Sequence, residues 1–231
     1  MTRPRLRILS SNLANGKADA DAFADLVEVV EPDVVAVQEL APAQADALAR
    51  VLPFGKLLPR FDHLGMGIAL RAPGSVRILH LPYRSALAAD VPGPEDDEPI
   101  EVLNLHLAAP HVPPLLRRVR QRRGQLRGIF AHLDVTPRRH RALVGDLNAT
   151  PMWRAYRRLQ TRFDDGAVQA ARRHGREPGR TWGPWHGSAR LLRIDHVLVQ
   201  GLVATDSRVL PLRGSDHSAL VVDLDLPSDS S

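Results

Sequence analysis

The residues that could do chemistry in this sequence stand where apolar stretches give way to polar ones. LVGDLNATP at 143–151 places Asp146 and Asn148 directly after a short apolar run. Other apolar runs contain or precede Asn12, Glu39, His106, Asp195, His196, Asp216 and His217. Each of these alone is consistent with a solvated strand end or a satisfied core residue. Because charged groups are costly to bury without partners, their joint recurrence favours a shared site.

These side chains suit one kind of chemistry. Carboxylate and amide oxygens, in a chain without cysteine, are typical ligands of a hard divalent cation. Mg²⁺ usually takes only one or two protein carboxylates and completes its shell with waters and substrate phosphate. Histidines next to aspartates can transfer protons at neutral pH. A metal, a base and an acid together predict the hydrolysis of a phosphate ester.

The pair Asp146-x-Asn148 has a further consequence. Both are ordinary turn residues, but residues i and i+2 at the end of a strand share a face and can act on the same group. A polar group that stabilises a transition state commonly contributes ~3–4 kcal/mol. A calcium-binding loop is excluded because Pro151 and Arg157 stand where it needs Gly and Glu. None of the ten histidines forms an H-E-x-x-H zinc motif.

The composition limits the remaining possibilities. A chain of 231 residues is long enough for one large domain, and we expect a single domain over 1–231 with its core at 5–226 and a frayed tail at 227–231. The absence of cysteine excludes disulfides, thiolate catalysis and cysteine-ligated zinc. The apolar start at Leu6–Leu9 is too short for a secretory signal, so a cytoplasmic protein is expected. No apolar run is long enough for a membrane helix, so no membrane insertion is expected.

The basic residues are nearly all arginines, and the net charge is +5. Residues 117–127, RRVRQRRGQLR, contain six arginines and no acid, and further clusters stand at 138–141, 154–158 and 172–176. A codon bias of the genome would produce the same excess of arginine. Where the clusters lie on the surface, they would attract polyanions such as nucleic acid or anionic lipid.

Apolar periodicity predicts more strands than helices. Strands are expected at 5–13, 33–38, 65–71, 75–81, 85–91, 99–107, 141–147, 193–200, 206–212 and 218–226. Helices are expected at 19–31, 41–52, 113–133 and 152–160, and a hairpin tip at 92–98. Several strands are apolar on both faces, which favours two packed sheets with helices outside.

The order of these motifs resembles the endonuclease/exonuclease/phosphatase, or DNase I-like, superfamily. The resemblance extends over about residues 5–226. It rests on Asn12, PDVVAVQE, GMGIAL, NLHL, GDLN, RTW before RIDHV, and the terminal SDH. The family implies an α/β fold, a four-layer α/β/β/α sandwich whose two mainly antiparallel sheets pack face to face. It also implies one or two Mg²⁺ or Mn²⁺ ions at one rim of the sandwich.

The resemblance also implies roles for the site residues. Glu39 is similar to the principal metal ligand, with Asn12 beside it and Asp216 near the metal. Asp146 would orient or deprotonate the attacking water, and Asn148 would hold that water and a phosphate oxygen. His217, paired with Asp195, resembles the histidine that contacts the scissile phosphate. His106 would stabilise the developing charge or protonate the leaving oxygen.

Other positions match the family less closely. Ala14 replaces an acid of some members, which weakens the case for a second tightly held metal. Arg84 resembles a phosphate-contacting arginine, whereas Arg122 and Gln125 match a helix pattern that we interpret as structural. Trp182, Trp185 and His186 are either substrate-binding residues of the cleft or a packed aromatic anchor.

The sequence therefore predicts a Mg²⁺-dependent phosphodiesterase, with a nuclease as the leading hypothesis. The expected partner is a phosphate-ester substrate, for which abundant arginine favours nucleic acid, and the protein is expected to be a monomer. A phosphatase or a sphingomyelinase-like phospholipase is the alternative within the hydrolases. A binding or biosynthetic protein that has lost phosphoryl chemistry is the alternative outside them, and the intact set of acids and histidines argues against it.

Overall fold

The computed structural model describes residues 5–93, 99–110 and 112–227. Within these ranges the chain forms two six-stranded sheets. The first sheet contains β1 (Leu6–Asn12), β2 (Val34–Gln38), β3 (Phe54–Leu58), β4 (Met66–Leu70), β11 (Val203–Pro211) and β12 (Ser218–Asp225). The second contains β5 (Ser75–Leu81), β6 (Arg84–Val91), β7 (Ile100–Asn104), β8 (Arg141–Asp146), β9 (Asp164–Asp165) and β10 (Asp195–Gln200).

Each sheet is built around one parallel pair of strands. The strand order is β11-β12-β1-β2-β4-β3 in the first sheet and β5-β6-β7-β8-β10-β9 in the second. Strand β1 pairs in parallel with β2, and β7 pairs in parallel with β8. Their neighbours β12, β4, β6 and β10 run antiparallel to them. The carboxyl ends of the central strands of each sheet therefore lie at the same edge.

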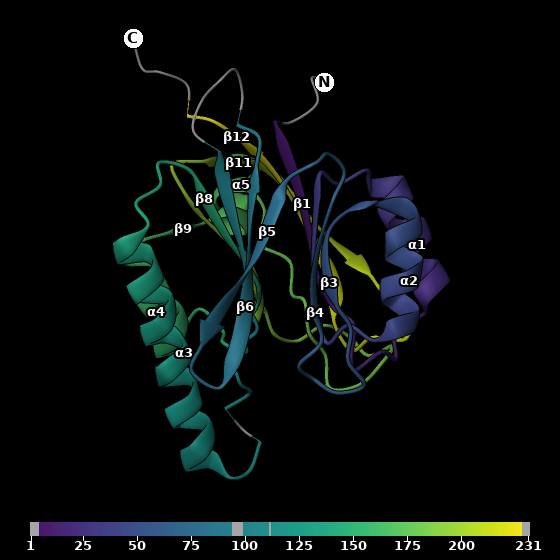
Figure 1. The fold of residues 1–231 in the computed structure, drawn as a ribbon, viewed down its shortest axis with the longest axis horizontal. Helices are drawn as coiled ribbons and strands as arrows, with labels where there is room; N and C mark the ends of the chain where they lie inside the picture. Colours follow the sequence, from purple (N-terminus) through teal and green to yellow (C-terminus); the bar gives the residue numbers. More distant parts are fainter. Residues whose placement is uncertain (1–4, 94–98, 111, 228–231) are drawn as a thin grey trace.

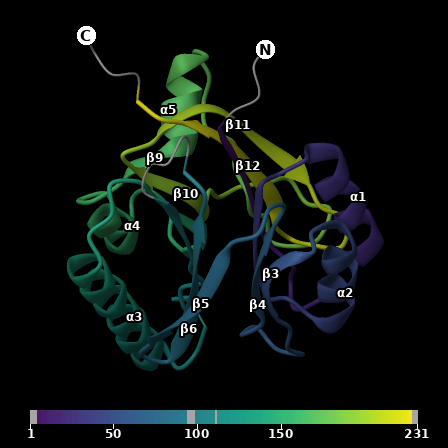
Figure 2. The same ribbon diagram turned by 45° about the horizontal axis from the view of Figure 1, so that its top comes forward.

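The elements are arranged in four layers (Figure 1). Helices α1 (Ala20–Val30) and α2 (Pro42–Val51) cover the outer face of the first sheet, and α3 (Leu115–Val135) and α4 (Arg154–Leu159) cover that of the second. The largest apolar core lies between the sheets and includes Ile8, Ile68, Leu87 and Val144. Helix α5 (Gly166–Arg173) packs on β11 and adds Ala170 to this core (Figure 2). The α/β/β/α sandwich expected from the sequence is confirmed.

Local sequence signals explain where the helices begin and end. Helix α1 begins after Asp19, whose side chain accepts a hydrogen bond from the Ala22 amide at 3.1 Å. It ends at Glu31 in the left-handed conformation, directly before Pro32. The helix buries Phe23 and Val27 against the first sheet. In the described part of the chain, no helix is long and apolar enough to cross a membrane.

Each of the ten predicted strands and four predicted helices corresponds to an observed element, but three elements were not predicted. Strand β3 lies at a sheet edge and is largely exposed, so its apolar pattern is weak. Strand β9 has only two residues, and α5 buries mainly alanines, which carry little apolar signal. Of the predicted tip at 92–98 and tail at 227–231, residues 94–98 and 228–231 lie outside the described residues.

The predicted strand at 99–107 is longer than the observed one. Strand β7 ends at Asn104, so His106 lies beyond it. The Leu105 amide still donates to the Val144 carbonyl, and the Leu107 amide donates to the Asp146 carbonyl. The chain therefore follows β8 to its end, and this keeps His106 at the rim of the sandwich.

Candidate active site

The candidate site residues predicted from the sequence lie together at one rim of the sandwich because of the directions of the strands that carry them. Asn12 is the last residue of β1, and Asp146 is the last residue of β8. Glu39 directly follows β2. Strands β10 and β12 run the opposite way, so Asp195, the first residue of β10, and His217, which precedes β12, lie at the same rim.

A cavity of about 470 Å³ opens at this rim. Of the residues predicted from the sequence, those that line it are Glu39, Arg84, His106, Asp146, Asn148, Trp182, Asp216 and His217. Asn12 and Asp195 are buried and contact this set through hydrogen bonds to Asp146 and His217. Trp185 and His186 are not among the lining residues, and Trp185 is 66% exposed.

Two carboxylates face each other at the centre of the site. Asp146 and Asp195 are register partners in the antiparallel pair β8–β10, and both are buried. Like charges directly opposite one another destabilise a sheet. Burial raises the pKa of Asp146, and the negative charge of Asp195 raises it further, to about 7. Folding therefore brings two acids together at one buried point, and any positive charge that offsets them must come from other residues.

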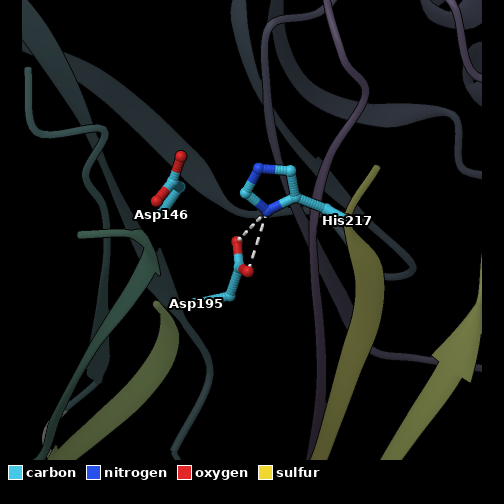
Figure 3. A group of neighbouring side chains, drawn as sticks. All are labelled: Asp146, Asp195 and His217. Atoms are coloured by element: carbon cyan, nitrogen blue, oxygen red, sulfur yellow. Dashed lines mark hydrogen bonds and ion pairs between the residues drawn. The ribbon is translucent and has the colours of Figure 1, made fainter. Parts of the chain in front are cut away.

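His217 forms an ion pair with one of these carboxylates (Figure 3). Its Nδ1 lies 2.9 Å and 3.1 Å from the two carboxylate oxygens of Asp195. Burial lowers the pKa of His217, but the attraction of Asp195 outweighs burial and the pKa rises to about 9. His217 is therefore a cation at neutral pH. Its Nδ1–H donates to Asp195, and its Nε2–H can donate to a bound group.

The loop before His217 is held by hydrogen bonds from distant segments. The Ser215 hydroxyl donates to the Asn12 carbonyl at 2.9 Å and accepts from the His217 amide at 3.0 Å. The Thr181 hydroxyl accepts from the Asp195 amide at 3.2 Å. The motifs RTW, RIDHV and SDH are thus joined through backbone groups, which fixes the His217–Asp195 pair.

Glu39 and Asn12 form the part of the site contributed by the first sheet. The Asn12 Nδ2 donates to the Asp146 Oδ2 at 3.0 Å and its Oδ1 accepts from the Ala14 amide at 2.9 Å, so the amide nitrogen faces the carboxylates. Burial raises the pKa of Glu39, although a hydrogen bond with Asn12 opposes this rise. Glu39 has a φ of 56°, a conformation that costs a non-glycine residue free energy and is concentrated at functional sites.

The GDLN turn also has an unusual backbone. Gly145 has a φ of 127°, and a Cβ there would lie 2.2 Å from the Leu105 carbonyl oxygen. Asn148 has a φ of 46°, which asparagine tolerates better than most residues. Its amide nitrogen donates to the Asp146 Oδ2 at 2.9 Å and to the Leu107 carbonyl at 3.1 Å. The turn therefore aims both side chains into the same cavity.

His106 and Arg84 form the opposite wall. The His106 Nε2 lies 3.5 Å from the Asp146 Oδ2 and 3.8 Å from the Glu39 Oε1. Burial holds the pKa of His106 well below its usual value, and the positive charges of Arg84 and His217 add to this effect. His106 is therefore neutral at pH 7. Burial also lowers the pKa of Arg84, which nevertheless stays a cation at this pH.

Arg122 and Gln125 hold the backbone behind this wall. The Gln125 amide nitrogen donates to the His106 carbonyl at 3.0 Å, and its oxygen accepts from the Ala108 amide at 3.0 Å. Arg122 donates to the Ala108 carbonyl at 2.6 Å. These contacts agree with the structural role that the sequence indicated for both residues.

Trp182 belongs to the cavity, unlike its neighbours in sequence. Its Nε1 donates to the Asp216 Oδ2 at 3.0 Å, and its backbone pairs with that of His217. Asp216 therefore has one carboxylate oxygen occupied by the indole. The structure separates Trp182, which lines the cavity, from Trp185 and His186, which do not.

Four polar or aromatic residues of the cavity were not predicted from the sequence: Asn15, His63, Arg118 and Trp153. Asn15 has a φ of 54° and closely follows Asn12. His63 precedes the glycine-led strand β4, and Trp153 follows the GDLN turn. Asn15, His63 and Trp153 could have been predicted because they stand close to recognised motifs. Arg118 belongs to the arginine run at 117–127, whose place in the fold the sequence did not indicate.

The donor set fits a hard divalent cation. One donor atom each from Asp146, Asp195 and His217 lies within 4.8 Å of the others, so this group could hold a metal ion. Asp195 and His217 are engaged with each other, and the carboxylates that line the cavity are those of Glu39, Asp146 and Asp216. Burial is the main cause of the raised pKa values of Glu39 and Asp146, and the negative charge of Asp195 adds to the shift of Asp146, so a divalent cation would favour the ionised form of both acids.

The fold and this rim together define a class of protein. The model of the Endonuclease/Exonuclease/phosphatase family matches residues 9–217. The chain belongs to this family, as its motifs suggested. Members of the family are phosphoesterases and nucleases. No curated protein matches the chain in sequence.

Solved structures share the fold of this chain. The chain is similar to an AP endonuclease from Archaeoglobus fulgidus, with a TM-score of 0.74, 15% identity and coverage of 96% of this chain and 100% of that one. It is also similar to a humanized TDP2 from D. rerio, with a TM-score of 0.73, 19% identity and coverage of 95% of this chain and 98% of that one. For the 3′ phosphatase NExo from Neisseria, bound to a product DNA hairpin, the TM-score is 0.70 and the identity 19%, with coverage of 95% of this chain and 99% of that one. At these identities the similarity establishes the fold.

Proposed function

We propose that the protein is a Mg²⁺- or Mn²⁺-dependent hydrolase of phosphate esters that acts as a phosphodiesterase, with nucleic acid as the substrate class. One observation carries the proposal. Asp146 lines a cavity together with Arg84 and His217, and the buried Asp195 lies opposite Asp146 and holds His217. A carboxylate with a raised pKa beside two cationic side chains suits metal-assisted phosphate chemistry.

The metal would be held by Glu39, with Asn12 beside it and Asp216 close by, while Asn12 also orients the Asp146 carboxylate. When bound, such an ion neutralises phosphate charge and polarises the ester for attack by water. The contacts of Asn12 with Asp146 and Ala14 support an orienting role, because they turn its amide nitrogen toward the acids.

Asp146 and Asn148 would manage the nucleophile. A carboxylate with a pKa of about 7 is close to the ideal for accepting a proton near neutral pH. Asn148 holds Asp146 through its Nδ2, which leaves its Oδ1 to accept a hydrogen bond from the attacking water. The two side chains would thereby fix both the direction and the protonation of that water.

His217 and Arg84 would stabilise the phosphate as negative charge develops. The Nε2–H of a cationic His217 would donate to a phosphate oxygen, while Asp195 holds the ring through Nδ1. Arg84 lines the same cavity and supplies a second fixed cation. His106, which is neutral, would donate a hydrogen bond rather than carry positive charge. Preorganised donors of this kind are commonly the largest catalytic contribution.

His217→Ala is the first test of this mechanism. We expect it to lower Mg²⁺-stimulated hydrolysis of bis-p-nitrophenyl phosphate by about 10²–10³-fold, because it removes a preorganised cation. A chelator should abolish the wild-type activity. His80→Ala, which changes an exposed histidine of β5, is the matched control and should retain activity. Full activity of the His217 variant would refute the assignment.

A substrate panel tests the class of ester. Plasmid DNA, structured RNA, bis-p-nitrophenyl phosphate and sphingomyelin would be compared with and without the chelator. Chelator-sensitive cleavage of DNA or RNA is the expected result. Hydrolysis of sphingomyelin alone would instead support the phospholipase alternative, and no hydrolysis of any ester would support a chain that has lost phosphoryl chemistry.

A further inference from the structure

A groove rich in arginine lies between α3 and α4, outside the catalytic cavity. It has a volume of about 580 Å³ and is lined by Arg122, Arg123, Arg127, Arg154 and Arg158 together with apolar residues, and it includes no acid. Arg122 is buried and fixed by backbone carbonyls. The other four side chains are exposed. The groove therefore concentrates positive charge at a concave surface.

The charge of this groove is not compensated within the described residues. Several exposed arginines elsewhere pair with acids, as Arg50 does with Asp21, Arg60 with Asp62 and Arg176 with Asp206.

By contrast, Arg123, Arg127 and Arg154 form no ion pair among the residues that the structure describes. Arg158 lies over the Phe130 ring at 4.8 Å, which orders the guanidinium without neutralising it. Clustered arginines without acids attract polyanions.

The groove adjoins the catalytic cavity. Pro110 lines both. Trp153 lines the cavity and precedes Arg154 of the groove, and Arg118 of α3 lines the cavity one helical turn before Arg122. A chain of phosphates whose scissile group lies beside His217 could thus pass onto the two helices without crossing an acidic surface.

We propose that this groove binds the phosphate backbone of a nucleic-acid strand that flanks the scissile phosphate. Nucleic acid is favoured over an anionic membrane because the positive charge lines a concave groove that leads into the catalytic cavity. Trp153, which is 41% exposed at the junction, offers a ring on which a base can stack. The proposal rests on the proposed function, because it extends the substrate of that site.

The test measures binding directly and so does not depend on turnover. The affinity of the full chain for a fluorescent single-stranded 20-mer would be measured by anisotropy in a chelator over a range of salt concentrations. The groove variant is Arg123→Gln/Arg127→Gln. The matched control is Arg172→Gln/Arg173→Gln, which removes two exposed arginines from α5 and hence the same net charge.

We expect the groove variant to weaken binding by about tenfold and to reduce the slope of log affinity against log salt by about 1 to 2, because two phosphate contacts are lost. The control should change affinity less than about twofold, as a distant charge effect. Equal loss in both variants, or no loss in the groove variant, would overturn the proposal.

Two further results separate the proposal from its alternatives. Vesicles containing phosphatidylglycerol are included because Leu116, near the start of α3, is 78% exposed. Vesicle binding that depends on Arg123 and Arg127, with unchanged DNA binding, would replace nucleic acid by a membrane surface. Groove-dependent DNA binding without any ester hydrolysis would refute the proposed function and leave the groove assignment intact.

Discussion

The two ends of the parallel pair β7–β8 hold buried acids in opposite electrostatic states. At the starting end, Glu101 accepts a hydrogen bond from the Arg141 Nε at 2.5 Å, lies 3.0 Å from the His132 Nε2 and also pairs with Arg77. At the finishing end, Asp146 is opposed by Asp195. Glu101 is thus in direct contact with arginine side chains, whereas the cross-strand partner of Asp146 is a second carboxylate.

Their pKa values record this difference. Burial by itself would raise the pKa of Glu101, but His132 and Arg141 outweigh it and lower the pKa to about 2. Burial and Asp195 together raise the pKa of Asp146 to about 7. The first arrangement stabilises the folded chain, whereas the second costs stability that a bound cation would restore. Strongly perturbed acids mark a functional site when their charge is left for a ligand to complete.

Asp146→Asn should produce the largest effect at the finishing end. We expect hydrolysis of bis-p-nitrophenyl phosphate to fall by at least about 10³-fold, or about 4 kcal/mol, because the substitution removes the carboxylate that we propose as the acceptor of the proton from water. The free energy of unfolding, measured by urea in a chelator, should fall less than for Glu101→Gln, because removing one of two opposed carboxylates offsets the loss of an acceptor for the Asn12 and Asn148 N–H groups. A variant that kept its activity, or lost as much stability as Glu101→Gln, would contradict the difference between the two ends.

Glu101→Gln should produce the converse result at the starting end. We expect the free energy of unfolding to fall by about 3 kcal/mol, because Arg141 is left buried without its charged partner. Asp206→Asn, which disrupts the exposed pair with Arg176, is the control and should cost less than about 1 kcal/mol. Similar losses of unfolding free energy in the two variants would show that the buried Glu101 pairs contribute no more to stability than an exposed ion pair.

The loss of wild-type stability at acid pH is expected to be smaller than the effects of Asp146→Asn on activity and of Glu101→Gln on stability. The folded pKa of Glu101 lies below its unfolded value of 4.5, so its contribution is complete above pH 4.5 and is lost as the pH falls toward about 2. Allowing for solvent screening, we expect about 2 kcal/mol of wild-type stability to disappear in this window. The same urea titrations on Glu101→Gln should show a correspondingly flatter dependence, and parallel curves would contradict the linkage.

Much of the fold could be predicted because apolar patterns are local. Runs such as VVAV at 34–37 and LVVDL at 220–224 indicated strands buried on both faces, and they lie in the central strands β2 and β12. Strand β3 and helix α5 were missed because an exposed edge strand and an alanine-rich helix bury little distinctive apolar surface. Tertiary packing rather than pattern forms both elements.

The candidate site was predicted in part for a similar reason. Asp146 and His217 stand in recognisable motifs, so their residue types could be read directly from the chain. Trp182 and Trp185 are three positions apart, yet only Trp182 lines the cavity. No local signal separates the two, because the difference depends on the backbone pairing of Trp182 with His217.

The types of the acids, amides and imidazoles, their order along the chain and the apolar strands next to them are local properties, so the amino-acid sequence is enough to predict them. Which of these side chains face one another depends on how the two sheets pack. The opposition of Asp146 and Asp195 follows from strand register, and the neutralisation of Glu101 follows from side chains of β5, α3 and β8. Charge state in a buried site depends on neighbours distant in sequence, and those neighbours exist only once the sheets have packed.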